Sequence, residues 1–292
     1  MQVKQITPFI GVEITGASYE ELIRPEAWAQ VEDGVQQHEL VVVRGIELTP
    51  QQQLDLAARL GRPVPFVITK YRHPEIEEIM ISSNESKDGK PLGVARVGNF
   101  WHQDSSFTPE PTPYTMLHGL NVPSSSGHTK FASAVDVYRR LPEEWRVRLA
   151  DRVGVHTVSK RLRIRPEHLG LSVAEFQAQA DVEHPPVEHP LLRKDEWTGE
   201  PYIYGCREYM HGILGFSLAE NEEFFELMDE LITDEEHVYT HVWTQNDLLI
   251  WKTFTAYHIA TEVEPGVGRT VHRISIDPAD RVGGPVDDEM VQ

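Results

Sequence analysis

The spacing of apolar and polar residues predicts several regular elements along the chain. Between 220 and 231 the apolar residues recur at helical spacing among acidic ones, which predicts an amphipathic helix with a solvated outer face. The run 248–251 is wholly apolar and follows a turn at 243–247, which predicts a buried strand. A Pro-Gly turn at 265–268 then leads into 269–276, where residues alternate as in a strand. The pattern is compatible with a β domain that carries helical additions.

Length and composition suit one soluble domain. The chain has 292 residues, of which 40% are hydrophobic, and it shows no internal repeat or break in composition, so we expect a single domain over 1–292. Cys206 is the only cysteine, which excludes an intrachain disulfide and indicates a packed residue rather than a nucleophile. No apolar run approaches the roughly 18 residues of a membrane span, and residues 1–5 lack a targeting core. We therefore expect a cytoplasmic protein.

The net charge narrows the range of partners. It is −19, from 27 basic and 46 acidic residues. A chain this acidic repels nucleic acid and anionic membrane surfaces. We therefore expect a small-molecule partner and neither nucleic acid nor membrane, while a homo-oligomer stays open.

Candidate metal ligands occur at His102-Gln103-Asp104 and, far along the chain, at His258. Side chains of an extended segment repeat every second residue, so His102 and Asp104 can point into one cavity. Two histidines and a carboxylate can bind one face of an octahedral Fe(II) ion and leave three positions open for small molecules. The triplet alone is weak evidence, because a solvated His-Asp hydrogen bond at a strand end is the ordinary alternative.

Two arginines follow the last histidine in the alternating segment. Arg269, Val271 and Arg273 share one face if 269–276 is a strand. Buried arginines are costly unless an anion meets them, and an arginine beyond the last ligand can hold the far carboxylate of a 2-oxoacid. The alternative is that this face meets solvent and that the intervening residues point inward.

Together these motifs make the chain resemble the Fe(II)/2-oxoglutarate oxygenases of the taurine dioxygenase type. The match runs in ordered blocks over nearly the whole length, which is far more specific than one triplet. The blocks are the strand 40–45, the helix 49–61, and the motifs at 101–104, 122–123, 127–129, 189–193, 198–202, 247, 251, 258, 269 and 273.

This resemblance implies both a fold and a metal. The fold would be mainly β with flanking helices, built on a double-stranded β-helix of the jelly-roll, cupin-like type. The residues matching His102, Asp104 and His258 bind Fe(II) in the family, and 2-oxoglutarate and O2 are the cosubstrates.

The resemblance also implies a cosubstrate site. In the family, the residue matching Arg273 binds the distal carboxylate of 2-oxoglutarate, the one matching Thr129 assists it, and the one matching Arg269 lies beside them. One departure is visible at 252–254, where the family usually has Asp-Asn-Arg and this chain has Lys-Thr-Phe. We expect the entrance near His258 to be built differently.

A basic stretch at 160–166 bears on the substrate. It carries four cations in a strongly acidic chain, and alone it would be a solvated segment paired with surface acids. With flanking blocks, it is similar to a segment in the branch of the superfamily that makes isonitrile natural products. In the members of that branch that install the isonitrile by N-oxidation of an N-carboxymethyl amino acid, the residues matching Arg163 and Arg165 bind the substrate carboxylate.

The expected substrate is a small amino-acid-derived carboxylic acid. Members of the branch that install the isonitrile by N-oxidation tend to carry adjacent tyrosines, where this chain has Phe66-Val67. That departure favours side-chain desaturation, or hydroxylation, of an amino acid that already bears an isonitrile. The predicted apolar wall of the pocket comprises Phe66, Tyr71, Trp101 and Phe107.

Three other functions stay open. A catabolic dioxygenase that cleaves a sulfonate or an aryloxy acid would share every iron ligand. A metal-dependent isomerase or hydrolase on a similar barrel would need no 2-oxoglutarate, and a non-catalytic binding barrel would need no iron. The polar segment 82–93 is either a lid that keeps water from the metal or an ordinary surface loop.

Overall fold

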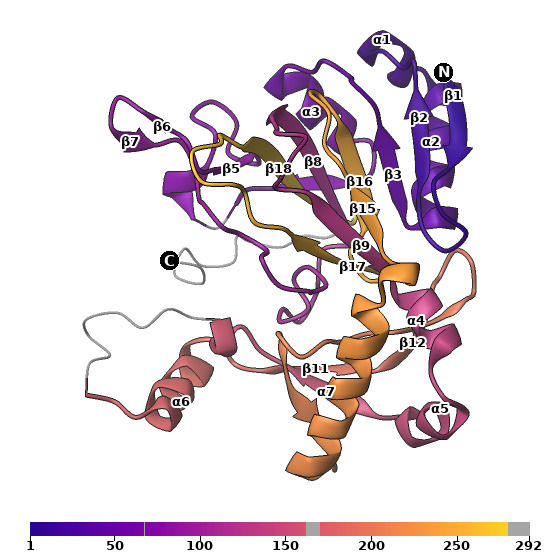
Figure 1. Ribbon diagram of the computed structural model, residues 1–292, viewed down its shortest axis with the longest axis vertical. Coiled ribbons are helices and arrows are strands. Elements are labelled where there is room, and N and C mark those ends of the chain that lie inside the picture. Colours follow the sequence, from indigo (N-terminus) through magenta and orange to yellow (C-terminus); the bar gives the residue numbers. More distant parts are fainter. Residues whose placement is uncertain (67, 162–169, 280–292) are drawn as a thin grey trace.

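The computed structural model describes residues 1–66, 68–161 and 170–279, and within them the fold is mainly β with helices outside (Figure 1). A large sheet has the strand order β1-β2-β3-β16-β8-β18-β4, and β5 also pairs with β18. β2 runs parallel to β3, and the other neighbours are antiparallel. The bounds are β1 (Gln2–Gln5), β2 (Val12–Thr15), β3 (Leu40–Val43), β4 (Arg62–Val64), β5 (Met80–Ser83), β8 (Tyr114–Asn121), β16 (Leu248–Lys252) and β18 (Thr270–Asp277).

A smaller sheet packs against one face of the large sheet. Its order is β15 (Tyr239–His241), β9 (Thr129–Ser133) and β17 (Ala256–Ala260). Phe131 and Ala256 of this sheet share one buried cluster with Leu117, Leu249 and Val271 of the large sheet. The two sheets therefore enclose a common apolar layer, and β9 and β17 lie over it (Figure 1).

The apolar strands are buried on both faces. Val41 and Val43 of β3 pack with Trp28 of α2 (Pro25–His38), whereas Leu40 and Val42 face the small sheet. The predicted strand 248–251 lies in β16 and is buried throughout for the same reason. Helices α1 (Tyr19–Leu22) and α3 (Pro50–Ala57) complete the layer outside the large sheet.

A long insertion between β9 and β15 forms a third apolar cluster. The predicted amphipathic helix lies within α7 (Leu218–Thr233), where Phe224 and Met228 are buried and Ser217 caps the first turn. No helix in the described part of the chain is long and apolar enough to cross a membrane. The other elements here are α4 (Ala134–Arg140), α5 (Glu143–Leu149), β10 (Val153–His156), α6 (Val173–Glu183), β11 (Val187–Pro190), β12 (Leu192–Lys194), β13 (Pro201–Ile203) and β14 (Met210–Ile213).

The polar segment 82–93 is partly regular. Its first two residues end β5, and a small hairpin follows in β6 (Ser86–Lys87) and β7 (Lys90–Pro91). Figure 1 shows this hairpin projecting from the edge of the large sheet.

A buried acid lies where α2 meets the small sheet. Glu39 has a φ of 67°, in the left-handed region that is uncommon for residues other than glycine. Ser133 Oγ donates a 2.6 Å hydrogen bond to Glu39 Oε1. Burial raises the pKa of Glu39 to about 8, although Ser133 and Lys252 act in the opposite direction. The folded protein therefore keeps a proton on this carboxyl at pH values where the unfolded chain has lost it.

We expect Glu39→Gln to stabilise the protein at pH 8 much more than at pH 4.5. Between the ordinary pKa of 4.5 and the folded value of about 8, the folded state binds more protons, so wild-type stability falls as pH rises. The loss across this window is on the order of 4 kcal/mol at 1.36 kcal/mol per pKa unit. Urea unfolding at several pH values measures it, with exposed Glu47→Gln as the control. Parallel pH profiles for wild type and Glu39→Gln would contradict the prediction.

Candidate metal centre

His102 and His258 are brought together by main-chain pairing. The two residues form an antiparallel bridge, in which His102 N donates to His258 O at 3.1 Å and His258 N donates to His102 O at 2.9 Å. His258 lies in β17, so the small sheet provides the rigid side of the bridge. The two imidazole centroids are 4.2 Å apart.

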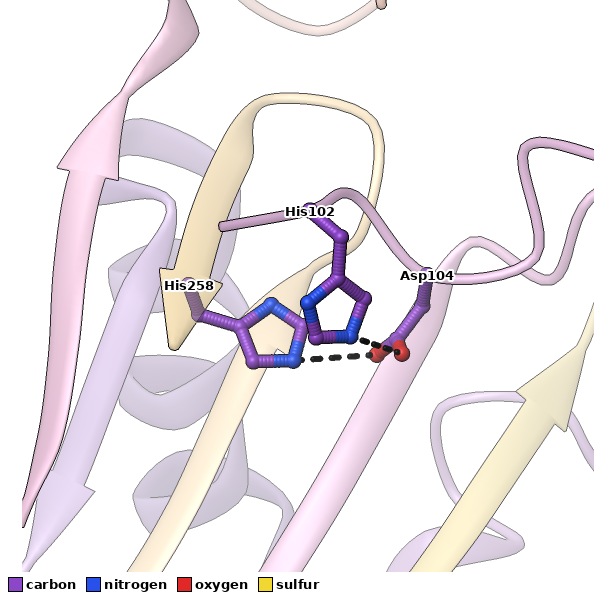
Figure 2. A group of neighbouring side chains, drawn as sticks. All are labelled: His102, Asp104 and His258. Atoms are coloured by element: carbon purple, nitrogen blue, oxygen red, sulfur yellow. Dashed lines mark ion pairs between the residues drawn. The ribbon is translucent and has the colours of Figure 1, made fainter. Parts of the chain in front are cut away.

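Asp104 completes the group, as the alternation of the extended segment predicted. Its Oδ1 is 3.6 Å from His102 Nε2 and its Oδ2 is 3.8 Å from His258 Nε2. Ligand atoms of the three buried residues all lie within 4.8 Å of one another. Figure 2 shows the three side chains pointing toward a common point.

Gln103 points the other way and fixes the segment from behind. Its amide group donates to the carbonyl of Phe254 and accepts a 2.8 Å hydrogen bond from Gly205 N. Phe254 and Lys252 also turn away from the metal ligands: the Phe254 ring packs on Tyr204, and Lys252 forms a buried ion pair with Asp195. The unusual sequence at 252–254 therefore provides the support behind Gln103, and the altered entrance beside His258 stays a prediction.

The donor atoms fit a divalent iron ion. His102 Nδ1 lies 2.8 Å from the carbonyl oxygen of Phe100, which leaves Nε2 as the unprotonated ligand when Nδ1 donates. Burial, with the neighbouring His102, lowers the pKa of His258 to about 3, so its imidazole is neutral. Burial alone would raise the pKa of Asp104, but Arg273 and the two histidines lower it well below its usual range. Neutral imidazoles and an ionised carboxylate are the forms that ligate a metal.

Two further side chains hold the Asp104 carboxylate. Thr115 Oγ donates a 2.8 Å hydrogen bond to Oδ2, and an Arg273 terminal nitrogen lies 3.0 Å from Oδ1. These residues come from β8 and β18, which pair in the large sheet. Thr115 and Arg273 of the large sheet thus orient Asp104, whereas His258 is carried by the small sheet.

Arg269 occupies a separate position, immediately before β18. Its Nε donates to the Gly127 carbonyl at 3.0 Å, and its guanidinium carbon lies 5.7 Å from the Trp243 ring centroid. Trp243 Nε1 donates to Thr129 Oγ at 3.2 Å. Burial lowers the pKa of Arg269 to about 10, and no carboxylate of the described residues pairs with it. The interior face predicted for the two arginines is confirmed by Val271, which is buried between the sheets.

Comparison with known proteins decides what this arrangement belongs to. The profile of the family described as "Taurine catabolism dioxygenase TauD, TfdA family" matches residues 2–275. The chain belongs to this family. It is therefore an Fe(II)/2-oxoglutarate-dependent dioxygenase, and the alternatives of an isomerase, a hydrolase or a non-catalytic barrel are wrong.

Individual relatives agree over most of the chain. The dioxygenase is 31% identical over 258 residues to pentalenolactone F synthase of Streptomyces arenae, covering 82% of this chain and 84% of that protein. It is 27% identical over 284 residues to the alpha-ketoglutarate-dependent 2,4-dichlorophenoxyacetate dioxygenase of Burkholderia sp. (strain RASC), with coverages of 91% and 90%.

Solved structures show the same fold. AAD-2 in complex with Mn(II) and N-oxalylglycine has a TM-score of 0.78 at 22% identity, covering 98% of this chain and 100% of that chain. A taurine dioxygenase from Burkholderia xenovorans has a TM-score of 0.75 at 22% identity, covering 94% and 90%.

The predicted substrate residues are only partly gathered at the metal centre of the dioxygenase. The Phe107 ring packs on Tyr209 at 4.8 Å, and Tyr209 in turn packs edge-on against His102 at 5.8 Å. Phe66 and Tyr71 belong to the neighbouring segment 66–72, and in the described chain neither ring packs against that of a metal ligand. Arg163 and Arg165 lie outside the described residues.

Two important residues were missed by sequence reasoning. Tyr209 follows no periodic pattern and reaches His102 only through the folded insertion. Thr115 stands beside the buried Met116 and Leu117 in β8, and a hydroxyl next to buried apolar residues was the available signal. Trp101, a predicted pocket residue, instead packs against the core of the insertion.

We expect Thr115→Val to weaken metal binding by about tenfold or more, because partners of a ligating carboxylate typically contribute that much. The substitution keeps the shape of the side chain and removes the donor to Asp104, together with the acceptor of a 3.4 Å hydrogen bond from a terminal nitrogen of Arg273. Titration of the metal-free protein with Fe(II) under anaerobic conditions measures the effect. Thr233→Val, at an exposed end of α7, is the control. Unchanged affinity in Thr115→Val would show that Asp104 is oriented without this hydrogen bond.

Proposed function

We propose that this dioxygenase oxidises a small carboxylic acid derived from an amino acid, with an isonitrile-bearing amino acid as the substrate class and desaturation as the outcome. The observation that carries the proposal is the presence of two guanidinium groups at different places relative to the metal ligands. Arg273 touches Asp104 at 3.0 Å, whereas Arg269 is held by Gly127 and Trp243. Two separate cations suit two anions, the cosubstrate and an acidic substrate.

The geometry supports Arg269 as the partner of the far carboxylate of 2-oxoglutarate. That carboxylate is separated from the chelating end by two methylene groups, so its partner should stand back from the metal. Among the described residues Arg269 contacts Gly127 and Trp243 and makes no ion pair with a metal ligand, and Thr129 and Trp243 beside it are connected by a hydrogen bond. The sequence prediction gave this role first to Arg273, with Thr129 assisting, and placed Arg269 second; we now propose the reverse order for the arginines.

Arg273 is then available for the acid group of the substrate. Its guanidinium lies at a metal-binding carboxylate, so a substrate anion bound to it would lie beside the metal ligands. Phe107 and Tyr209 supply an apolar wall next to His102. Arg163 and Arg165 as further carboxylate anchors, and Phe66 and Tyr71 as further wall residues, stay predictions.

Iron, 2-oxoglutarate and O2 supply the oxidant when they are bound, and the protein supplies position. The described residues hold the acid end and the apolar body of a substrate at different points, so one C–H bond can be presented to the metal. We further propose that the two facing sheets form a double-stranded β-helix. In support, His258 of β17 in the small sheet is bridged to the segment that carries His102 and Asp104.

A catabolic role is the second candidate. It is favoured by relatives named for 2,4-dichlorophenoxyacetate and, at 25% identity, by an alpha-ketoglutarate-dependent sulfate ester dioxygenase of Pseudomonas putida. The relative named as a synthase, at 31% identity, favours a biosynthetic role.

Succinate formation under air with Fe(II) and 2-oxoglutarate tests the proposal. The panel comprises aromatic isonitrile acids, the same amino acids without the isonitrile, taurine and an aryloxyacetate. We expect succinate to be coupled to loss of two hydrogens only from the isonitrile acids, because these match the apolar wall and the cationic anchor. Turnover of taurine or the aryloxyacetate, with none of an isonitrile acid, would instead establish the catabolic role.

The two arginines should respond differently to substitution. We expect Arg269→Gln to weaken 2-oxoglutarate binding by at least about 30-fold, since truncating one partner of a buried charge pair costs on the order of 2–5 kcal/mol. Arg269→Lys should rescue it only in part, because an ammonium lacks the bidentate fork. Arg273→Gln should raise the KM for the substrate and the uncoupled formation of succinate.

Isothermal titration of the Mn(II)-loaded protein with 2-oxoglutarate separates these effects from turnover. The control is Arg24→Gln, at the N-terminus of α2 and remote from both sheets' shared layer. A larger loss of 2-oxoglutarate affinity in Arg273→Gln than in Arg269→Gln would restore the order that the sequence predicted.

A further inference from the structure

Polar residues that follow β5 form hydrogen bonds with the main chain around Arg269. Arg269 N donates a 2.7 Å hydrogen bond to Asn84 Oδ1, and Asn84 N donates to Arg269 O at 3.2 Å. Asn84 Nδ2 also donates to Val267 O at 2.8 Å. One residue thus binds both main-chain groups of the arginine and the turn that precedes it.

Glu85 binds the next residue, Thr270, which begins β18. Thr270 Oγ donates a 2.6 Å hydrogen bond to Glu85 Oε2, and the Ser83 and Thr270 hydroxyl oxygens are 2.7 Å apart. The Thr270 hydrogen bond is the main cause that lowers the pKa of Glu85. A Cβ at Gly268 would come within 2.7 Å of Glu85 Oε1, so a larger residue there would displace the Glu85 carboxylate.

The side chain of Arg269 is held from the opposite direction. Its Nε is bound by the Gly127 carbonyl, and its guanidinium lies over Trp243. Gly127 has a φ of +66°, and a Cβ there would approach Arg269 Cδ to 2.9 Å. The arginine therefore has two supports, one on its main chain from Asn84 and Glu85 and one on its side chain.

We propose that Asn84 and Glu85 are positioning residues that place Arg269 for the far carboxylate of 2-oxoglutarate. This inference rests on the role proposed above for Arg269. A guanidinium binds a carboxylate through paired, directional hydrogen bonds, so a small shift of the arginine weakens both of them. Asn84 and Glu85 thereby act on cosubstrate affinity and leave the metal ligands untouched.

The test compares two 2-oxoacids on the Mn(II)-loaded protein by isothermal titration. Asn84→Ala is expected to raise the Kd for 2-oxoglutarate by about threefold to tenfold, the usual worth of one or two hydrogen bonds. It should leave the Kd for pyruvate unchanged, because pyruvate has no second carboxylate. The Kd for Mn(II) should not change either. Lys87→Ala, an exposed residue of β6 in the same segment, is the matched control.

A double-mutant cycle with Arg269→Gln distinguishes positioning from general loosening. The effect of Asn84→Ala on 2-oxoglutarate should vanish in the Arg269→Gln background, because the arginine transmits it. Glu85→Gln carries the same test if Asn84→Ala does not fold.

Three results would overturn the inference. The first is unchanged 2-oxoglutarate affinity in the folded variants, and the second is an equal loss for pyruvate or Mn(II). The third is a persistent effect of Asn84→Ala in the Arg269→Gln background. If 2-oxoglutarate binds weakly to Arg269→Gln but normally to Asn84→Ala, only the positioning role of Asn84 is refuted. If 2-oxoglutarate binds normally to Arg269→Gln, the cosubstrate role of Arg269 is refuted as well.

Discussion

The antiparallel bridge between His102 and His258 is the constraint on which the rest of the site depends. Two reciprocal hydrogen bonds, of 3.1 and 2.9 Å, fix segments that are far apart in sequence. Because side chains alternate along an extended segment, the bridge places His102 and Asp104 toward the metal and Gln103 away from it. Gln103 then holds Gly205 and Phe254, so the long insertion is attached to the back of the same segment.

Electrostatics explains why a chain of net charge −19 keeps arginines inside. Arg273 stabilises the ionised form of Asp104, and Thr115 completes the shell around that carboxylate. Arg269 has no such carboxylate among the described residues, and burial has lowered its pKa to about 10. A dianionic cosubstrate that bridges the metal and Arg269 would offset the cost of both buried cationic centres.

Local pattern predicted what local pattern controls. The strand 248–251 is apolar because both of its faces are covered, and the metal ligands stand out as a triplet followed by a distant histidine. Alternation correctly placed Arg269 and Arg273 on an interior face. It does not show how far each arginine lies from the metal ligands, so it could not decide which of them would bind the cosubstrate and which the substrate. Asn84 and Glu85 were read as part of a loop, because turn-forming residues have the same composition whether they face solvent or bind a neighbouring turn. The contact between Tyr209 and His102 depends on how the long insertion packs against the sheets, which the local sequence pattern does not reveal.

The segment from β5 to His102 links the metal to the proposed cosubstrate site. Asn84 binds Arg269, Ser83 N then donates to Val94 O, and further along the Gly98 carbonyl accepts from Ala260 of the strand that carries His258. Gly98 itself lies so close that a Cβ would come within 3.2 Å of the His102 ring. One continuous stretch thus contacts the arginine at one end and both histidines at the other. The proposed binding of 2-oxoglutarate between the metal and Arg269 requires a fixed span between the two, and a segment bound at both ends is a physical reason for that span to stay constant.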